Sequence, residues 1–352
     1  MGLKILHSAD WHMDTPFTIF NPEQREFLKQ ELKRVPGKIA DLCLRENCDL
    51  VLLSGDIFDG AYTKESVAIV REALERCAVP VFIAPGNHDY VGAGSPWTDE
   101  PWPANVHIFT GDLSSVVIPK LDCRVYGAGY KSAESPSLLE DFRAGGMERY
   151  KVAVLHGDPL QLHSPYCPVT AAQVRDANLD YLALGHIHKA GSFRARGQLC
   201  GWPGVPMGRG YDETQEKGVY IIQLEDTATL RFAPLYTPRF YDVELNTQTQ
   251  TPEDVLPAMG RQHFYRITLT GSGDESLDML RRQLYAYPNV ELIDHREQPL
   301  DPWERLDEDT LEGTYLRLLR AKMNVNDPET SEIIQMAAEI SRMLIEGKEV
   351  VL

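Results

Sequence analysis

Residues 5–12 read Ile-Leu-His-Ser-Ala-Asp-Trp-His, an apolar run that passes directly into side chains able to bind a metal ion. Four more apolar runs, each also followed by polar residues, come later in the chain, at 50–54, 79–84, 152–156 and 181–184. Short apolar runs bounded by turn-forming residues are typical of buried strands. The first run itself covers residues 4–7. This pattern predicts a buried sheet with polar side chains gathered at the ends of its strands.

Segments with helical spacing separate the early strand candidates. Their apolar residues recur as on one face of a helix, at 26–34, 36–45 and 64–77. Pro36 and Gly37 are expected to break what would otherwise be one helix, with Pro36 in a first helical turn. Strands that alternate with helices favour an α/β core. Later strand candidates, at 116–118, 123–126, 219–224 and 229–232, have no helix between them, so part of the sheet should be antiparallel or mixed.

Composition and charge exclude several classes of protein. The 352 residues have a normal globular composition, and the apolar runs are too short for a membrane helix of roughly 20 residues. The first residues lack the pattern of a secretory signal, and six scattered cysteines without a CxxC pair indicate reduced thiols. We therefore expect a cytoplasmic location. The net charge of −17 excludes a broadly basic surface, so DNA binding would need a local basic patch, bound metal or a partner.

The patterns divide the chain into three regions, of which 1–238 contains all the strands and helices above. In 239–300, strand candidates at 240–245, 264–269 and 289–293 alternate with helix candidates at 252–259 and 275–285, which predicts a small α/β accessory domain. Residues 301–352 contain two helical patterns, and Asp327 with Pro328 suits the N-cap and first turn of the second. We expect a helical hairpin, either packed on the rest of the chain or docking another subunit.

Five groups of Asp, Asn and His residues follow the predicted strands. They are Asp10-Trp11-His12, Gly55-Asp56-Ile57-Phe58-Asp59, Gly86-Asn87-His88-Asp89, His156-Gly157-Asp158 and Gly185-His186-Ile187-His188. Each group alone is compatible with an ordinary turn, a helix cap or a hydrogen-bonded core histidine. Ligand sites of α/β folds lie at the carboxyl ends of strands, and five such groups make coincidence a poor explanation. Imidazole and carboxylate without thiolate suit Mn, Fe or Zn rather than a structural zinc site.

In this order the five groups resemble the signature of the calcineurin-like metallophosphoesterase superfamily, D-x-H, GD-x-x-D, GNH[DE], H and GH-x-H, across residues 10–188. Within that superfamily the chain most resembles the DNA-repair exonucleases of the SbcD and YhaO type. Residues 5–12, 55–59, 203–206 (Pro-Gly-Val-Pro) and 208–210 (Gly-Arg-Gly) carry this closer resemblance. The resemblance implies a four-layer αββα sandwich with mixed sheets and a centre for two divalent metal ions, usually Mn²⁺ in the nuclease branch, with Fe or Zn as alternatives.

The resemblance also implies a role for each residue of the centre. Asp10, His12 and His188 would hold the first metal, Asp56 would bridge both metals, and Asn87, His156 and His186 would complete the second. A carboxylate can bridge because each of its oxygens can face one of two cations roughly 3.5–4 Å apart. Asp59 and Asp89 are expected to orient histidine rings or metal-bound waters.

The implied chemistry is hydrolysis of a phosphodiester bond by a metal-bound hydroxide. His88 is not needed as a ligand, so the resemblance assigns it a catalytic role: it would contact the scissile phosphate and protonate the leaving oxygen. Arg209 is a candidate phosphate contact, because guanidinium groups pair bidentately with phosphate. A surface arginine in a glycine-rich loop is the equal alternative for Arg209.

The resemblance points first to a Mn²⁺-dependent phosphodiesterase that acts on DNA ends, a nuclease subunit in DNA repair. In the family the partner is a coiled-coil ATPase docked through a C-terminal helical hairpin, and nuclease relatives often form homodimers. No membrane partner is expected. Two alternatives stay open. One is a phosphodiesterase or phosphatase for small nucleotides, and the other is a catalytically silent scaffold or DNA-end-binding subunit. The complete ligand set argues against the scaffold.

Overall fold

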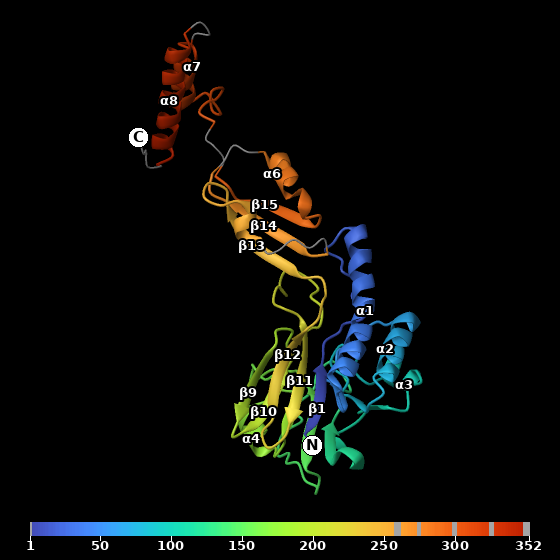
Figure 1. The fold of residues 1–352 in the computed structure, drawn as a ribbon. Coiled ribbons are helices and arrows are strands. Elements are labelled where there is room, and N and C mark those ends of the chain that lie inside the picture. Colours follow the sequence, from blue (N-terminus) through green and yellow to red (C-terminus); the bar gives the residue numbers. More distant parts are fainter. Residues whose placement is uncertain (1, 257–261, 273–275, 298–300, 324–326, 348–352) are drawn as a thin grey trace. The chain divides into compact units, whose positions relative to one another are not determined.

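The computed structural model describes residues 2–256, 262–272, 276–297, 301–323 and 327–347 (Figure 1). The chain divides into two compact units, each described below by itself. The first consists of Met1–Asp242, Gly260–Arg266 and Tyr287–Asn289, and the second of Val243–Met259, Ile267–Ala286 and Val290–Leu352. All five groups of candidate metal ligands lie in the first unit.

The described part of the first unit contains two mixed sheets of six strands each. The first sheet has the order β12 (Thr229–Pro234), β11 (Gly218–Leu224), β1 (Leu3–Ser8), β2 (Leu50–Leu53), β3 (Val81–Ile83) and β4 (Val106–Ile108). The second has the order β5 (Ser114–Ile118), β6 (Cys123–Gly127), β7 (Tyr150–His156), β8 (Tyr181–Gly185), β10 (Gln198–Trp202) and β9 (Gly191–Ala195). In each sheet four neighbouring strands are parallel: β1 to β4 in the first, and β6, β7, β8 and β10 in the second. The predicted α/β core with mixed sheets is confirmed.

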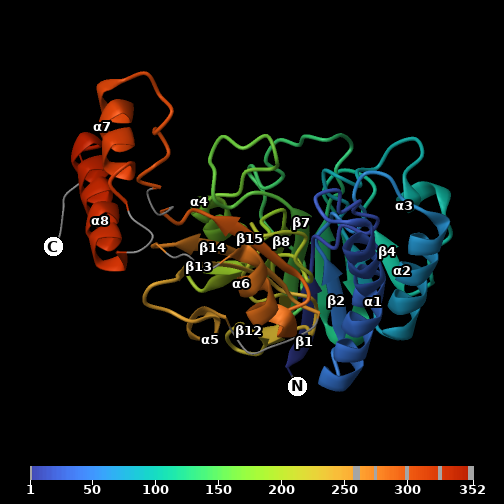
Figure 2. The same ribbon diagram turned by 90° about the horizontal axis from the view of Figure 1, so that it is seen from above.

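Three apolar layers hold this unit together. Successive side chains of a strand point to opposite faces, so Leu6 and Val51 contact the helices while Ile5 and Leu52 face the other sheet. The helices on the first sheet are α1 (Pro22–Glu46) and α2 (Lys64–Arg76), which lie side by side along it in Figure 2. The outer face of the second sheet packs against α4 (Ala171–Asp176) and neighbouring loops.

The expected break at Pro36 and Gly37 is wrong, because α1 continues through both residues. An internal proline costs a helix about 3 kcal/mol. Here Pro36 is itself buried, and it shares its face with buried Leu32, Val35 and Ile39. Burial of each such side chain stabilises by about 1.5–3 kcal/mol, so packing outweighs the lost backbone hydrogen bond.

Short elements that the sequence patterns did not predict complete the unit. They are α3 (Pro96–Asp99), α4, β4, β9, β10 and a single 3₁₀ turn, η1 (Pro119–Leu121). Of these, β9 and β10 form an antiparallel hairpin in which Gln198 pairs with Ala195. This hairpin leads into the loop that carries Arg209.

A three-stranded sheet in the order β13 (Phe240–Asn246), β14 (Phe264–Thr270) and β15 (Val290–Asp294) confirms the three accessory strands expected after residue 239. The helix expected at 252–259 is α5 (Pro252–Val255), and residues 257–259 lie outside the described residues. The helix expected at 275–285 is α6 (Leu277–Gln283), followed by the 3₁₀ turn η2 (Leu284–Ala286); residue 275 is also outside the described residues.

The tail forms two helices, α7 (Leu311–Arg320) and α8 (Pro328–Ile345), which pack against each other. Asp327 caps α8 as expected, its side chain accepting the backbone N–H of Thr330. Several apolar side chains of the two helices are exposed: Leu311, Leu318, Ile333, Met336 and Leu344. Among the described residues, no helix combines the length and the apolar character that crossing a membrane requires.

Candidate metal centre

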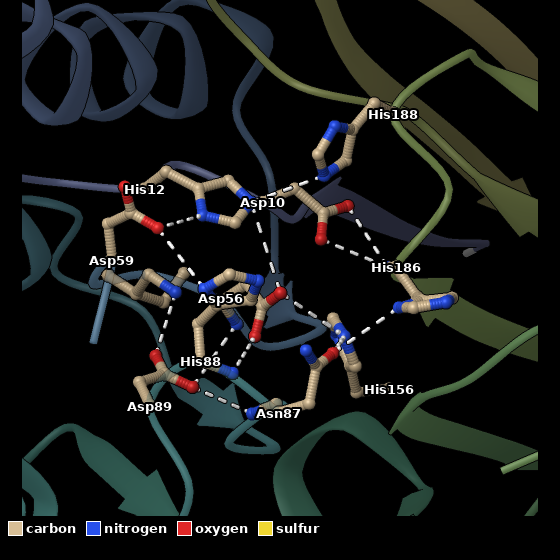
Figure 3. A network of polar contacts seen from close by, with 12 residues as sticks. Asp10, His12, Asp56, Asp59, Asn87, His88, Asp89, His156, His186 and His188 are labelled. Atoms are coloured by element: carbon tan, nitrogen blue, oxygen red, sulfur yellow. Dashed lines mark hydrogen bonds and ion pairs between the residues drawn. The ribbon is translucent and has the colours of Figure 1, made fainter. Parts of the chain in front are cut away.

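The loops after five parallel strands bring the predicted ligand residues to one place (Figure 3). Asp10 and His12 follow β1, Asp56 follows β2, and Asn87 follows β3. From the second sheet, His156 ends β7, and His186 and His188 follow β8. Because β1, β2 and β3 are parallel, as are β7 and β8, the carboxyl ends of each group meet at one edge of their sheet.

The backbone around these residues is tightly constrained. Asp10, His12, Asp56 and His186 all have positive φ angles, between 49° and 83°. Such conformations cost non-glycine residues about 1–3 kcal/mol each and are typical of functional sites. Backbone hydrogen bonds of 3.0 Å, from Asp10 N–H to Gly55 and from His12 N–H to Asp56, join the loops after β1 and β2. Fixed backbone therefore holds these candidate metal-binding side chains in place.

One group of donor atoms consists of Asp10, His12 and His188, each offering an atom within 4.8 Å of the others. The Nε2 atoms of His12 and His188 lie 3.2 Å apart. Two imidazole nitrogens with their lone pairs directed at one another require a proton or a cation between them. Burial lowers the pKa of His12, so the metal-binding neutral ring is favoured over a protonated one.

A second group lies beside the first. The Nε2 atom of His156 is 2.8 Å from Oδ1 of Asn87 and 3.4 Å from Oδ2 of Asp56. Nδ1 of His186 lies 3.3 Å from the same Asn87 oxygen. Burial and the neighbouring His156 lower the pKa of His186 to about 4, which keeps its ring neutral.

Asp56 stands between the two groups. Its Oδ2 lies 3.9 Å from Nε2 of His12 and 3.4 Å from Nε2 of His156. Burial raises the pKa of Asp56, but the nearby His156 and His12 outweigh that effect and lower it, so the carboxylate is ionised. The donor set of imidazoles, carboxylates and one amide oxygen, with no thiolate, is consistent with two divalent metal ions.

Hydrogen bonds outside the centre fix three of the histidine rings. Nδ1 of His156 donates to the backbone carbonyl of Ser54 (2.8 Å), and Nδ1 of His12 donates to Asp59 (3.2 Å). Nδ1 of His188 donates to Glu213 (2.8 Å). In each ring Nε2 is then the nitrogen that faces inward with a free lone pair, which is how metal-binding histidines are oriented.

Asp59 and Asp89 have different partners. Asp59 accepts hydrogen bonds from His12, His88 and Thr15. Burial raises the pKa of Asp59, but the bonds from His12 and His88 hold it well below its usual range. Asp89 contacts backbone rather than rings: it accepts the N–H groups of Gly86 (2.7 Å) and Ile57 (2.7 Å) and thereby joins the loops after β2 and β3.

His88 and Arg209 flank the donor atoms. His88 is 45% exposed, and its Nδ1 lies 3.2 Å from Oδ1 of Asp59. That hydrogen bond raises the pKa of His88, although burial opposes it. The Nη2 atom of Arg209 lies 3.0 Å from Nδ1 of His188. One ring that can hold a proton and one guanidinium therefore stand beside the centre.

Sequence patterns did not mark two residues that contact the centre. Glu213 accepts the His188 hydrogen bond from a loop between β10 and β11. The half-buried ring of Tyr166 lies 4.7 Å from the ring of His186. Neither residue follows a predicted strand. The only available signal for Glu213 was its spacing of four residues after Arg209, which is too common to be diagnostic.

The fold and this centre define a metallophosphoesterase, and the chain belongs to the calcineurin-like phosphoesterase family, whose model matches residues 3–190. Uncharacterized metallophosphoesterase YhaO of Bacillus subtilis (strain 168) is 31% identical over 239 residues, 63% of this chain and 57% of that protein. The chain thus spans a little more than half the length of that relative.

Two more distant relatives have assigned activities. SbcD, one of the components of the nuclease SbcCD of Staphylococcus epidermidis, is 23% identical over 327 residues, 82% of this chain and 84% of that protein. The 3′,5′-cyclic adenosine monophosphate phosphodiesterase CpdA of Haemophilus influenzae is 25% identical over 202 residues, 53% of this chain and 70% of that protein. The chain is similar to both, at identities of 25% or less.

Proposed function

We propose that this metallophosphoesterase is a DNA-directed phosphodiesterase, the exonuclease or endonuclease subunit of a DNA-repair complex. The observation that carries the proposal is the position of Asp56 between two groups of metal-binding side chains, with His88 beside them. The similarity to a nuclease component over 84% of that protein's length supports DNA as the substrate.

Two Mn²⁺ ions are the cofactors that we propose. Asp10, His12 and His188 would hold one, Asn87, His156 and His186 the other, with Asp56 shared between them. Bound there, divalent ions supply an activated water and positive charge for the phosphate oxygens. The chain itself supplies rigid donors, since hydrogen bonds from three rings to Ser54, Asp59 and Glu213 leave Nε2 directed inward.

His88 is the proposed proton donor for the leaving oxygen. Asp59 accepts from its Nδ1, which leaves Nε2 as the nitrogen that can face a substrate. The same contact raises the pKa of His88 and so favours the protonated ring that a general acid needs. Arg209 is the proposed contact for a phosphate oxygen.

DNA binding is expected to depend on a partner. The net charge of −17 opposes binding of DNA, which is also strongly negative. We therefore propose that the tail 301–352 docks a coiled-coil ATPase subunit. We also propose that the chain can form a homodimer. The exposed apolar residues of α7 and α8 support such docking, because they form no part of the hairpin's own core. In this proposal 1–238 is the catalytic domain and 239–300 the accessory domain.

A small-nucleotide phosphodiesterase is the second candidate, favoured by the similarity to a cyclic AMP phosphodiesterase. Mn²⁺-loaded protein, alone and together with a co-purified ATPase, would be assayed on a labelled single-stranded oligonucleotide, on cyclic AMP and on bis-p-nitrophenyl phosphate. The proposal expects cleavage of the oligonucleotide and of the generic diester. Hydrolysis of cyclic AMP with no cleavage of DNA in either preparation would favour the second candidate instead.

A further inference from the structure

Glu213 is a buried carboxylate at the edge of the metal centre that none of the five motifs contains. It lies on the loop between β10 and β11, and only 5% of the residue is exposed. Its Oε1 accepts the Nδ1–H of His188 at 2.8 Å, and its Oε2 accepts the backbone N–H of Arg209 at 2.8 Å. Nη2 of Arg209 is also 3.3 Å from Oε1. One side chain thus contacts both a metal-site histidine and the candidate phosphate contact.

Because both contact the same oxygen, Oε1 of Glu213 orients the His188 ring and the Arg209 guanidinium. Nη2 of Arg209 and Nδ1 of His188 lie 3.0 Å apart, and both are donors, so neither can satisfy the other. Glu213 Oε1 accepts from both. This keeps Nε2 of His188 directed at Nε2 of His12, and it keeps the guanidinium next to the ring. Nε of Arg209 is buried and has no hydrogen-bond partner among the described residues.

Charged groups surround Glu213. Arg209 and the buried Lys217 both interact electrostatically with the Glu213 carboxylate. Asp212 also interacts with Lys217, so the two cations of this loop face two carboxylates. Of these cations, Arg209 is the one that contacts the metal-site histidine, at 3.0 Å from Nδ1 of His188.

We propose that Glu213 is a positioning residue that fixes His188 for the metal and Arg209 for the substrate phosphate through a single carboxylate. The inference rests on the proposed phosphoesterase mechanism and adds a residue that couples metal binding to phosphate binding. It separates two kinds of variant. Loss of Arg209 removes the phosphate contact but leaves the hydrogen bond between His188 and Glu213, whereas loss of Glu213 weakens both metal and phosphate binding.

The first test measures metal binding without any turnover. Mn²⁺ is titrated into metal-free protein by calorimetry for the wild type and for Glu213→Ala, Glu213→Gln and Arg209→Ala. Glu213→Ala should weaken Mn²⁺ binding at one site by about 10–100-fold, the usual effect of removing a partner of a metal-binding histidine. Glu213→Gln keeps an oxygen acceptor for His188 and should bind Mn²⁺ more tightly than the alanine variant. Arg209→Ala keeps the hydrogen bond between His188 and Glu213 and removes a cation beside His188, so it should bind Mn²⁺ at least as tightly as the wild type.

The second test uses inorganic phosphate as the probe on Mn²⁺-saturated protein. Arg209→Ala should weaken phosphate binding about tenfold or more, as expected for one charge-assisted hydrogen bond. Glu213→Ala should weaken it to a similar extent. Glu216→Ala is the matched control, because this glutamate of the same loop is exposed and pairs with Arg239. It should change neither Mn²⁺ nor phosphate binding.

Each outcome has a clear meaning. Mn²⁺ affinity of Glu213→Ala within about twofold of the wild type would overturn the assignment and leave the proposed function intact. Unchanged phosphate binding in Arg209→Ala would overturn it as well, since Glu213 would then have no phosphate contact to position. A wild-type protein that binds no Mn²⁺ would overturn both the assignment and the proposed function. If Glu213→Ala fails to fold, Glu213→Gln decides. Mn²⁺ binding weaker than that of Arg209→Ala would support the assignment, and equal binding would overturn it.

Discussion

Replacement of His88 by alanine removes the proposed proton donor while leaving all seven predicted metal ligands in place. The imidazole makes one side-chain hydrogen bond, at 3.2 Å to Asp59, and it is 45% exposed. Loss of a single such bond costs about 1 kcal/mol of folding free energy. The variant should therefore fold and bind two Mn²⁺ ions per chain.

The expected loss of rate follows from the role of a general acid. Positioned proton donors contribute about 10²–10⁴-fold, which corresponds to about 3–5 kcal/mol of activation free energy. The full effect should appear with an alkoxide leaving group, such as the 3′ or 5′ oxygen of DNA. With p-nitrophenolate, a leaving group that needs little protonation, the loss should shrink to about tenfold or less.

The assay compares kcat on an oligonucleotide and on bis-p-nitrophenyl phosphate for the wild type, His88→Ala and His163→Ala. His163 is an exposed histidine in the loop after β7 and serves as the control, with rates equal to the wild type. Equal losses of His88→Ala on both substrates would refute the proton-donor role. If His88→Ala bound only one Mn²⁺ ion, His88 would itself be a metal ligand. Its ring nitrogen offers a donor atom within 4.8 Å of those of His12 and Asp56.

Four further predictions concern the centre and the fold. Gly86→Ala should abolish Mn²⁺ binding in a calorimetric titration, because its Cβ would lie 2.3 Å from Oδ1 of Asp56, whereas Gly111→Ala, with open space around it, should bind normally. Mn²⁺ at 100-fold above its Kd should raise the free energy of unfolding by about 2.7 kcal/mol for each site, about 5.4 kcal/mol for two, and EDTA should reverse this. Phe20→Ala should lower the free energy of unfolding by about 3–5 kcal/mol in urea titrations, because the buried ring of Phe20 packs against the rings of Phe240 and Phe264. Burial lowers the pKa of His7 from its ordinary value of 6.5 to about 3, so the unfolded chain binds one more proton below pH 6.5. The unfolding free energy should then fall by about 1.4 kcal/mol per pH unit between pH 6 and 4 from this group, and the fall should be absent in His7→Gln.

The results that would contradict these predictions are equally specific. They are Mn²⁺ binding by Gly86→Ala equal to that of Gly111→Ala, an unfolding midpoint that does not respond to Mn²⁺, a loss below about 1 kcal/mol in Phe20→Ala, and equal pH dependence of stability in His7→Gln and the wild type.

The centre could be predicted from the sequence because its residues follow strands. A parallel strand delivers whatever follows it to the same edge of the sheet, so Asp10, Asp56 and Asn87 converge through β1, β2 and β3 without any knowledge of the loops. Glu213 could not be predicted in this way. Its contact with His188 depends on the path of a long loop, and nothing local in the sequence encodes that path.

The two main differences in the fold have similar causes. Pro36 remains inside α1 because a buried face stabilises the helix more than one missing hydrogen bond destabilises it, which local propensity does not report. The β9–β10 hairpin was missed because β9 alternates half-buried with exposed residues. Its turn also uses Arg196 and Gly197 with positive φ angles (51° and 91°) in place of the usual Asn-Gly pair.

The central claim is that two groups of side chains, joined by Asp56, bind two divalent ions. The most direct test counts the metal ions bound to purified, metal-free protein after reconstitution with Mn²⁺, for the wild type and for Asp56→Asn. We expect two ions per chain in the wild type and fewer than two in the variant. The asparagine amide has a single, uncharged oxygen, so it cannot offer one anionic oxygen to each ion. A wild-type protein that binds one ion or none, or an Asp56→Asn variant that retains both ions at wild-type affinity, would contradict this account.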